Sequence, residues 1–237
     1  MNYCGVVPVR AMLQLALLEE VRVPEPPVQL SAIFYEPGSA GQVAAELQSL
    51  GDVAVGLGAP VSEPLDGRPS RACDALLAER GVSLQPPDAE MFRLAAQLEG
   101  FRTFAPANGD GEGAVPEGSY HDFAAFETNA DGVFCALQGQ RLPARRHPLG
   151  VQLRIEELEG DHVVDDGGEL WHRRIEELDA AAAALCAHRY AVGHACWIGD
   201  GEEGVVVLPG SSLPERFTSA GVMPPVERLQ LPPEPAG

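Results

Sequence analysis

The chain contains no lysine, and its charge is strongly unbalanced. All 16 basic residues are arginines, and 35 acidic residues bring the net charge to -19 at pH 7. Phosphate neutralisation needs basic side chains, so this balance disfavours broad, non-specific binding to nucleic acid. The sequence also has no apolar run near the roughly 20 residues that a membrane-spanning helix needs, so we expect no membrane partner.

Cysteine and aromatic residues are also scarce. The five cysteines form no C-x-x-C pair, which argues against a structural zinc site or a disulfide framework and favours buried free thiols. Residues 1–9 lack the basic segment of a signal peptide, so we expect a soluble, cytoplasmic protein. Aromatic residues make up 6% of a chain that is 45% hydrophobic, so the core is expected to consist mainly of Ala, Val and Leu.

The first sixty residues have the pattern of three strands, a helix and a fourth strand. Short apolar runs between turns predict strands over 3–9, 12–18 and 29–35. Helical spacing follows over 39–50. The run 53–57 is apolar throughout, which is typical of a parallel strand that is buried on both faces.

The rest of the chain predicts one α/β domain over residues 1–210 and a Pro-rich, extended tail over 211–237. The last 27 residues contain six of the 21 prolines. The elements expected after residue 60 are helices at 71–80, 88–100, 130–137 and 148–158, a loop at 105–119, a strand at 122–128, a helix beginning near Glu169, and two short strands before residue 210.

One acid lies on the apolar stripe of the last long helix. At 100° per residue, Trp171, Ile175, Leu178 and Cys186 share a face, and Asp179 lies at its edge. A carboxylate against a core costs free energy unless a metal ion or hydrogen bonds compensate it. Asp179 is therefore the first candidate site residue, and a purely structural, hydrogen-bonded role is the alternative.

Short motifs follow one another along the chain in a recognisable order. Residues 4–10 read CGVVPVR and resemble a first-strand motif of the form G-(V/I)-D-P-x-R. Residues 55–60 read VGLGAP and, with Arg68, Cys73 and Asp74 downstream, resemble an (I/L)-D-A-P … R-x-C-D element.

Two further motifs lie in the second half of the chain. Residues 126–129 read FETN and resemble a strand that ends in E-(V/T)-x-P. Residues 177–180 read ELDA and, with Trp197 and the pair Glu203 and Gly204 beyond them, resemble a closing D-A-(L/A) helix and its E-G-x-I strand.

Together these motifs look like the family of predicted RNase H-like nucleases catalogued as domain of unknown function four hundred twenty-nine, over roughly residues 3–210. The resemblance implies an α/β, RNase H-like fold with a mixed central sheet flanked by helices. In such enzymes, carboxylates hold two divalent ions about 4 Å apart that hydrolyse a phosphodiester. The resemblance implies Glu127 and Asp179 as the catalytic and metal-binding residues.

Two of the acids that the family uses are absent. The first-strand position is Val7 and the fourth-strand position is Gly58. Mg²⁺ and Mn²⁺ need oxygen ligands, which these residues do not supply. We therefore expect Mg²⁺ or Mn²⁺ to be weakly bound or absent, and hydrolysis to be weakened or lost. Asp52, Asp66 and Glu36 are the nearby acids that remain as alternatives for compensation.

Arginines in two places are candidates for substrate binding. Arg68 and Arg71 follow the fourth strand and would lie at its carboxyl end, where open α/β sheets bind ligands. Arg145 and Arg146 belong to a dense basic cluster suited to bidentate contacts with phosphate. The alternative is a solvated loop that pairs with nearby glutamates.

Two functions follow from these observations. The first is a divalent-metal-dependent nuclease of the RNase H-like type with degenerate chemistry, whose nucleic-acid substrate the net charge disfavours. The second is a non-catalytic protein that uses the remodelled cleft to bind an unidentified protein or small-molecule partner.

Overall fold

The computed structural model describes residues 1–21, 28–65, 67–98, 102–104, 106, 110–116 and 124–219. Its strands are β1 (Asn2–Val9), β2 (Met12–Val21), β3 (Gln29–Phe34), β4 (Val53–Leu57), β5 (Arg102–Thr103), β6 (Asp110–Ala114), β7 (Ala124–Glu127), β8 (Val163–Asp165), β9 (Ala195–Asp200) and β10 (Gly204–Pro209). Its helices are α1 (Ala40–Ser49), α2 (Ala72–Glu79), α3 (Ala89–Gln97), α4 (Ala130–Gln138), α5 (Pro148–Gly160), the short 3₁₀ helix η1 (Leu170–His172) and α6 (Ile175–Ala191).

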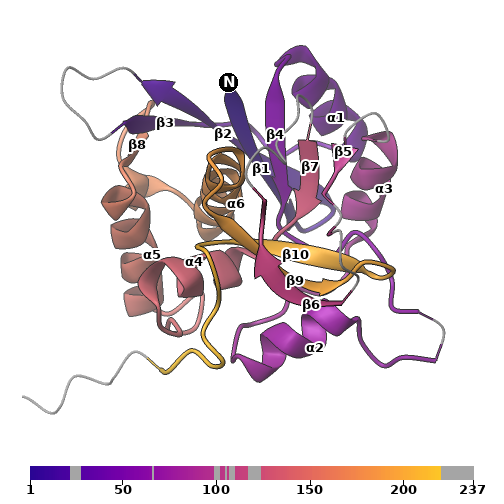
Figure 1. Cartoon of the computed structure of the whole chain (residues 1–237). Coiled ribbons are helices and arrows are strands. Elements are labelled where there is room, and N and C mark those ends of the chain that lie inside the picture. The colour runs from indigo at the N-terminus through magenta and orange to yellow at the C-terminus, as the bar shows by residue number, and fades with distance from the viewer. Residues whose placement is uncertain are drawn as a thin grey trace, which may run out of the picture.

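The described strands form one mixed sheet in the order β6-β9-β10-β7-β4-β1-β2-β3-β8, and β5 pairs with β7 (Figure 1). β1, β2 and β3 are antiparallel neighbours. After α1 the chain returns as β4, which is parallel to β1, and β7 in turn is parallel to β4. The predicted order of three strands, a helix and a parallel strand is confirmed, and the protein has the RNase H-like fold.

Helices cover both faces of the sheet. α1 and α3 lie on one face and bury Val43, Leu47, Met91 and Leu94 against β1, β2 and β4. α4, α5 and α6 lie on the other face, and α6 crosses the centre of the sheet (Figure 1). Strand side chains alternate between these two cores, so Val6 faces α1 and α3 while Val7 faces α6.

Two glycines let α6 lie directly on the sheet backbone. Gly5 of β1 and Gly56 of β4 are register partners. A Cβ atom on Gly5 would lie 1.9 Å from the carbonyl oxygen of Ala180, and one on Gly56 would lie 2.4 Å from that of Ala183. Any larger residue would push the helix away, so these glycines and the alanines of α6 set the depth at which Asp179 is held.

The structure corrects two predicted elements. The expected loop over 105–119 contains strand β6, which pairs with β9. The last helix begins at Ile175 and not near Glu169, because Arg173 and Arg174 are extended and separate it from the 3₁₀ turn Leu170–His172. Trp171 belongs to that turn and is 51% exposed, so its predicted place on the buried face of the helix is wrong.

Packing continues beyond residue 210, where the sequence predicts a tail. Phe217 is buried and its N–H donates to the carbonyl of Arg80. Ser219 forms a parallel bridge with Arg141. The part of the predicted tail from residue 220 onward, and residues 122–123 of the predicted strand 122–128, lie outside the described residues. Within the described chain, no helix has the length and apolar character of a membrane span.

Candidate functional site

Val7 and Gly58, the two positions that lack acids, lie next to each other, and the Val7 side chain packs against Gly58. Val7 is buried near the end of β1. Gly58 follows β4 and continues its pairing, since its N–H donates to the Val6 carbonyl at 2.8 Å. A Cβ on Gly58 would lie 2.6 Å from Cγ1 of Val7 and 3.7 Å from Cβ of Ala183 on α6. The Val7 isopropyl group therefore occupies the space that a side chain at position 58 would need.

Glu127 lies beside these positions at the carboxyl end of β7. It pairs in register with Leu57 of β4, as the parallel strand order requires. Its carboxylate is buried and is held by Arg71, with Oε1 accepting from Nη2 at 2.5 Å and Oε2 from Nη1 at 2.6 Å. Oε2 also accepts from the backbone N–H of Val61 at 3.1 Å.

Arg71 is the centre of this cluster. It is 1% exposed, and it also donates from Nε and Nη2 to Asp74 at 2.8 and 2.9 Å and from Nη1 to the Ser62 hydroxyl at 3.0 Å. These contacts use all five guanidinium N–H groups. Burial acts to lower the pKa of Arg71, but its bonds to Glu127 and Asp74 outweigh burial and raise that pKa well above its usual range. No N–H of Arg71 is left for the predicted contact with a substrate.

The same cluster contains the described residues whose spacing best matches a metal site. Ligand atoms of Cys73, Asp74 and Glu127 lie within 4.8 Å of one another. Burial raises the pKa of Cys73 to about 12, so the thiol stays protonated and is not a ligand for a hard cation. Both carboxylates are already bonded to the charged guanidinium of Arg71. The donor set therefore does not fit a Mg²⁺ or Mn²⁺ ion.

Arg68 lies between two acids of the β9–β10 hairpin, Asp200 and Glu203. Its Nη1 atom lies 3.4 Å from Asp200 and 3.0 Å from Glu203, and its side chain is 47% exposed. Glu203 also accepts from the backbone N–H groups of Leu65 and Ala72, so it holds the loop after β4 and the start of α2. A contact between Arg68 and a substrate stays a prediction.

Asp179 belongs to a separate cluster on α6. It is buried, and its Oδ2 atom accepts from Nε of Arg145 at 2.5 Å and from Nη2 of the same residue. Burial raises the pKa of Asp179 to about 6, against the opposing charges of Arg145 and Arg154. Arg154 is itself buried and pairs with Asp131 at 2.5 Å. Glu127 and Asp179 thus each have their own arginine, and no ion pair between described residues joins the two.

The other acids considered from the sequence lie away from this cluster. Asp52 precedes β4, where its carbonyl accepts from Asn2, so it lies at the opposite end of the strand from Gly58. Glu36 is exposed after the end of β3. Asp66 lies outside the described residues.

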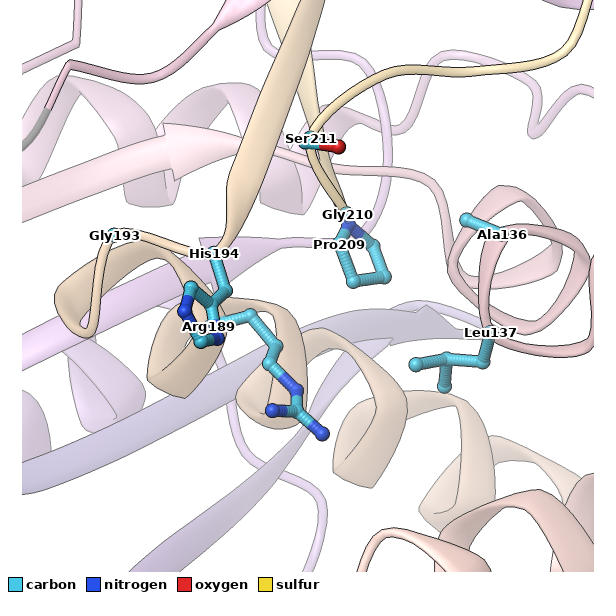
Figure 2. A pocket seen from close by; sticks show the side chains of 8 residues that line it. All are labelled: Ala136, Leu137, Arg189, Gly193, His194, Pro209, Gly210 and Ser211. Carbon is cyan, nitrogen blue, oxygen red and sulfur yellow. The ribbon is translucent and has the colours of Figure 1, made fainter.

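Arg145 and Arg146 line an open groove of about 650 Å³. Nη2 of Arg146 lies 2.8 Å from Oε1 of Glu176, and the Arg146 side chain is largely exposed. A second hollow, of about 400 Å³, lies at the other end of α6, with Arg189 and His194 on one side and Leu137 on the other (Figure 2). Arg189 is engaged by Asp161 at 2.5 Å. The second hollow contains none of the predicted site residues.

Comparisons with known proteins add little to this picture. No family profile and no curated protein matches the chain. Among solved structures, the chain is similar to one described as the Thermus thermophilus RuvC structure. The TM-score is 0.37 and the identity 14%, over 78% of this chain and 92% of that chain. The fold assignment therefore rests on the strand order and pairing.

Sequence reasoning missed the roles of three residues in the Glu127 cluster. Asp74, Ser62 and Glu203 position Arg71 and its loop. A signal for one of them, Asp74, was present, because residues 71–74 read RACD and match R-x-C-D at its own spacing. That spacing assigns the arginine of the motif to Arg71 and not to Arg68.

Proposed function

We propose that this protein is a divergent relative of the predicted RNase H-like nucleases of domain of unknown function four hundred twenty-nine that has lost two-metal hydrolysis and uses its remodelled cleft for binding. The observation that carries the proposal is the position of Arg71. Its guanidinium lies between Glu127 and Asp74 and bonds both carboxylates. A fixed cation of the protein thus neutralises Glu127, one of the two carboxylates that the resemblance assigns to metal binding.

Electrostatics supports this reading. A divalent ion at the carboxylates would lie close to the charged guanidinium. At a separation of about 4 Å and an effective dielectric of about 20, a +1 and a +2 charge repel by roughly 8 kcal/mol. Arg71 has no open route to solvent, since it is buried and held by five hydrogen bonds. Metal binding would require this network to break first.

The remaining positions supply no alternative ligands. Val7 and Gly58 offer no side-chain oxygen, and a side chain at position 58 would collide with Cγ1 of Val7. Asp179 carries a raised pKa and its own partner, Arg145. Two-metal catalysis needs several carboxylates around two adjacent ions. The described residues at these positions offer two carboxylates, each neutralised by a different arginine.

A cleavage assay tests the loss of hydrolysis. Single-stranded DNA, RNA, an RNA–DNA hybrid and a four-way DNA junction are incubated with the protein in Mg²⁺ and in Mn²⁺. The matched control is the double variant Glu127→Gln with Asp179→Asn, purified in the same way. We expect the two proteins to show the same background. Cleavage by the parent protein that disappears in the double variant would overturn the proposal.

A further inference from the structure

The groove beside Arg145 and Arg146 gathers positive charge on an acidic protein. Among the described residues that line it are four of the 16 arginines, namely Arg10, Arg145, Arg146 and Arg174, and one acid, Glu176. It lies where β1 turns into β2, at the end of β1 that contains Val7. The groove therefore opens next to the closed acid positions and lies over the start of α6.

Arg10 is held in an unusual backbone conformation at the edge of this groove. It lies in the two-residue turn between the paired residues Val9 and Met12, and its φ is 57°. This is a position at which hairpins normally use glycine. Arg10 is exposed, and it has no ion pair or side-chain hydrogen bond among the described residues. A strained arginine without a partner in the described part of the chain favours a binding role for its side chain.

The other three arginines are oriented by acids behind them and keep free donors. Arg145 uses Nε and Nη2 on Asp179, and Arg146 uses Nη2 on Glu176. Arg174 uses Nε on Glu177 and Nη2 on Gln14. The Nη1 groups of all three have no acceptor among the described residues. Arg145, which buried Asp179 holds through Nε and Nη2, therefore loses little freedom on binding an anion.

The anion that best fits these donors is a phosphate group. Planar guanidinium forks match phosphate oxygens, and several of them together can neutralise a doubly charged group. The N-terminus of the 17-residue helix α6 faces the groove and adds a favourable field for an anion, although Glu176 and Glu177 in its first turn offset part of that field. A net charge of -19 repels a long polyanion far more than a small one, which favours a small ligand.

We infer that this groove binds the phosphate group of a small phosphorylated molecule, such as a nucleotide. The inference rests on the part of the proposed function that makes this a binding protein, and it names the chemical class of the ligand. The free donors of Arg10 and Arg146 contact the phosphate, and Arg145 links the ligand to Asp179. The volume of about 650 Å³ is within the range of small-molecule sites.

Calorimetric titration with inorganic pyrophosphate, AMP and a short oligothymidylate tests this inference. All titrations are done in EDTA, so that a divalent metal ion cannot bridge the phosphate and the protein. We expect pyrophosphate or AMP to bind with a submillimolar Kd. The substitutions Arg10→Gly and Arg146→Gln should each weaken binding about tenfold or more, the usual effect of losing a charge-assisted hydrogen bond. Arg10→Lys, which keeps the charge, should weaken it less than Arg10→Gly.

The matched control is Arg93→Gln. Arg93 is also an exposed arginine paired with a glutamate, Glu90, but it lies on α3 on the other face of the sheet. Its loss should leave ligand affinity unchanged, because it changes the net charge equally without touching the groove. If pyrophosphate binds and AMP does not, the ligand is an inorganic phosphate. If AMP binds more tightly than pyrophosphate, the ligand is a nucleotide. Both results support the inference.

Three results would overturn it: no binding of pyrophosphate or AMP at millimolar concentration, equal binding in the parent and Arg10→Gly, or tighter binding of the oligothymidylate than of AMP. These readouts are independent of nuclease activity. A protein that cleaves nucleic acid and also binds AMP would refute the proposed function and leave the phosphate site standing. A protein without cleavage or phosphate binding would refute the phosphate site alone.

Discussion

Replacing Arg71 by methionine measures how much the buried guanidinium contributes to the free energy of unfolding. The substitution removes five hydrogen bonds and leaves Glu127 buried, with the Val61 N–H as its remaining partner among the described residues. Breaking a buried ion pair from one side typically costs about 3–5 kcal/mol, because the other charge stays uncompensated. Domains of this size are stable by about 5–15 kcal/mol, so the variant should still fold.

Urea denaturation in EDTA, followed by circular dichroism, measures this loss. The double variant Arg71→Met with Glu127→Gln should be more stable than Arg71→Met, because it removes the stranded charge. Arg71→Lys keeps the charge but not the bidentate geometry, so it should fall between the parent and Arg71→Met. A decrease of less than about 1 kcal/mol in the free energy of unfolding of Arg71→Met would refute the reasoning, because a buried carboxylate without a partner destabilises the fold by more than that.

The same variant should bind Mn²⁺ more tightly than the parent protein does. Without the guanidinium, Glu127 and Asp74 present oxygen ligands with no cation between them. If Mn²⁺ then binds with a Kd of about 0.1 mM, 1 mM Mn²⁺ should stabilise the variant by about 1.4 kcal/mol. The double variant with Glu127→Gln is the control and should gain much less. Equal stabilisation of the parent by Mn²⁺ would show that Arg71 does not exclude the ion.

Three further changes have defined outcomes. Folding raises the pKa of Asp179 from 3.8 to about 6, so the protonated form stabilises the fold at low pH and the contribution is lost as pH rises through 6. The unfolding free energy of the parent minus that of Asp179→Asn should therefore fall by about 2–3 kcal/mol from pH 4 to pH 7, and a rise would mean that the Arg145 ion pair dominates. Gly5→Ala should cost about 3 kcal/mol in urea denaturation because its Cβ meets the α6 backbone, whereas Gly41→Ala on the exposed side of α1 should cost nothing; equal effects would refute the close packing of α6. Arg10→Gly should stabilise the protein by roughly 0.5 kcal/mol in thermal denaturation while it weakens phosphate binding, and a destabilised variant would contradict the strain assigned to its backbone.

The arrangement of the early strands could be predicted because its signals are local. Each of β1 to β4 is an apolar run bounded by turn residues, and pairing follows from the order of the runs. Strand β6 could not be predicted in this way. Its sequence DGEGA has no apolar alternation, and it joins the sheet through backbone pairing with β9. The position of Trp171 could not be predicted from helical spacing, because Arg173 and Arg174 adopt an extended backbone and interrupt the helix.

The composition of the site could be predicted in part and its chemistry could not. The resemblance identified Val7 and Gly58 as the positions without acids, but it gave no indication that their atoms fill one space. The burial of Arg71 depends on Ser62, Asp74 and Glu127, which come from three parts of the chain. Only the folded backbone brings these groups together. From the sequence alone, Arg71 is therefore predicted as a substrate contact, because it follows a strand.

Whether Arg71 excludes a metal ion is tested most directly by a crystal of the parent protein soaked in Mn²⁺ and measured at a wavelength where manganese scatters anomalously. We expect no anomalous peak at Glu127, Asp74 or Asp179, and clear density for the guanidinium of Arg71 between Glu127 and Asp74. An anomalous peak at Glu127, with Arg71 displaced, would contradict this expectation and would restore metal-dependent hydrolysis as the function to test.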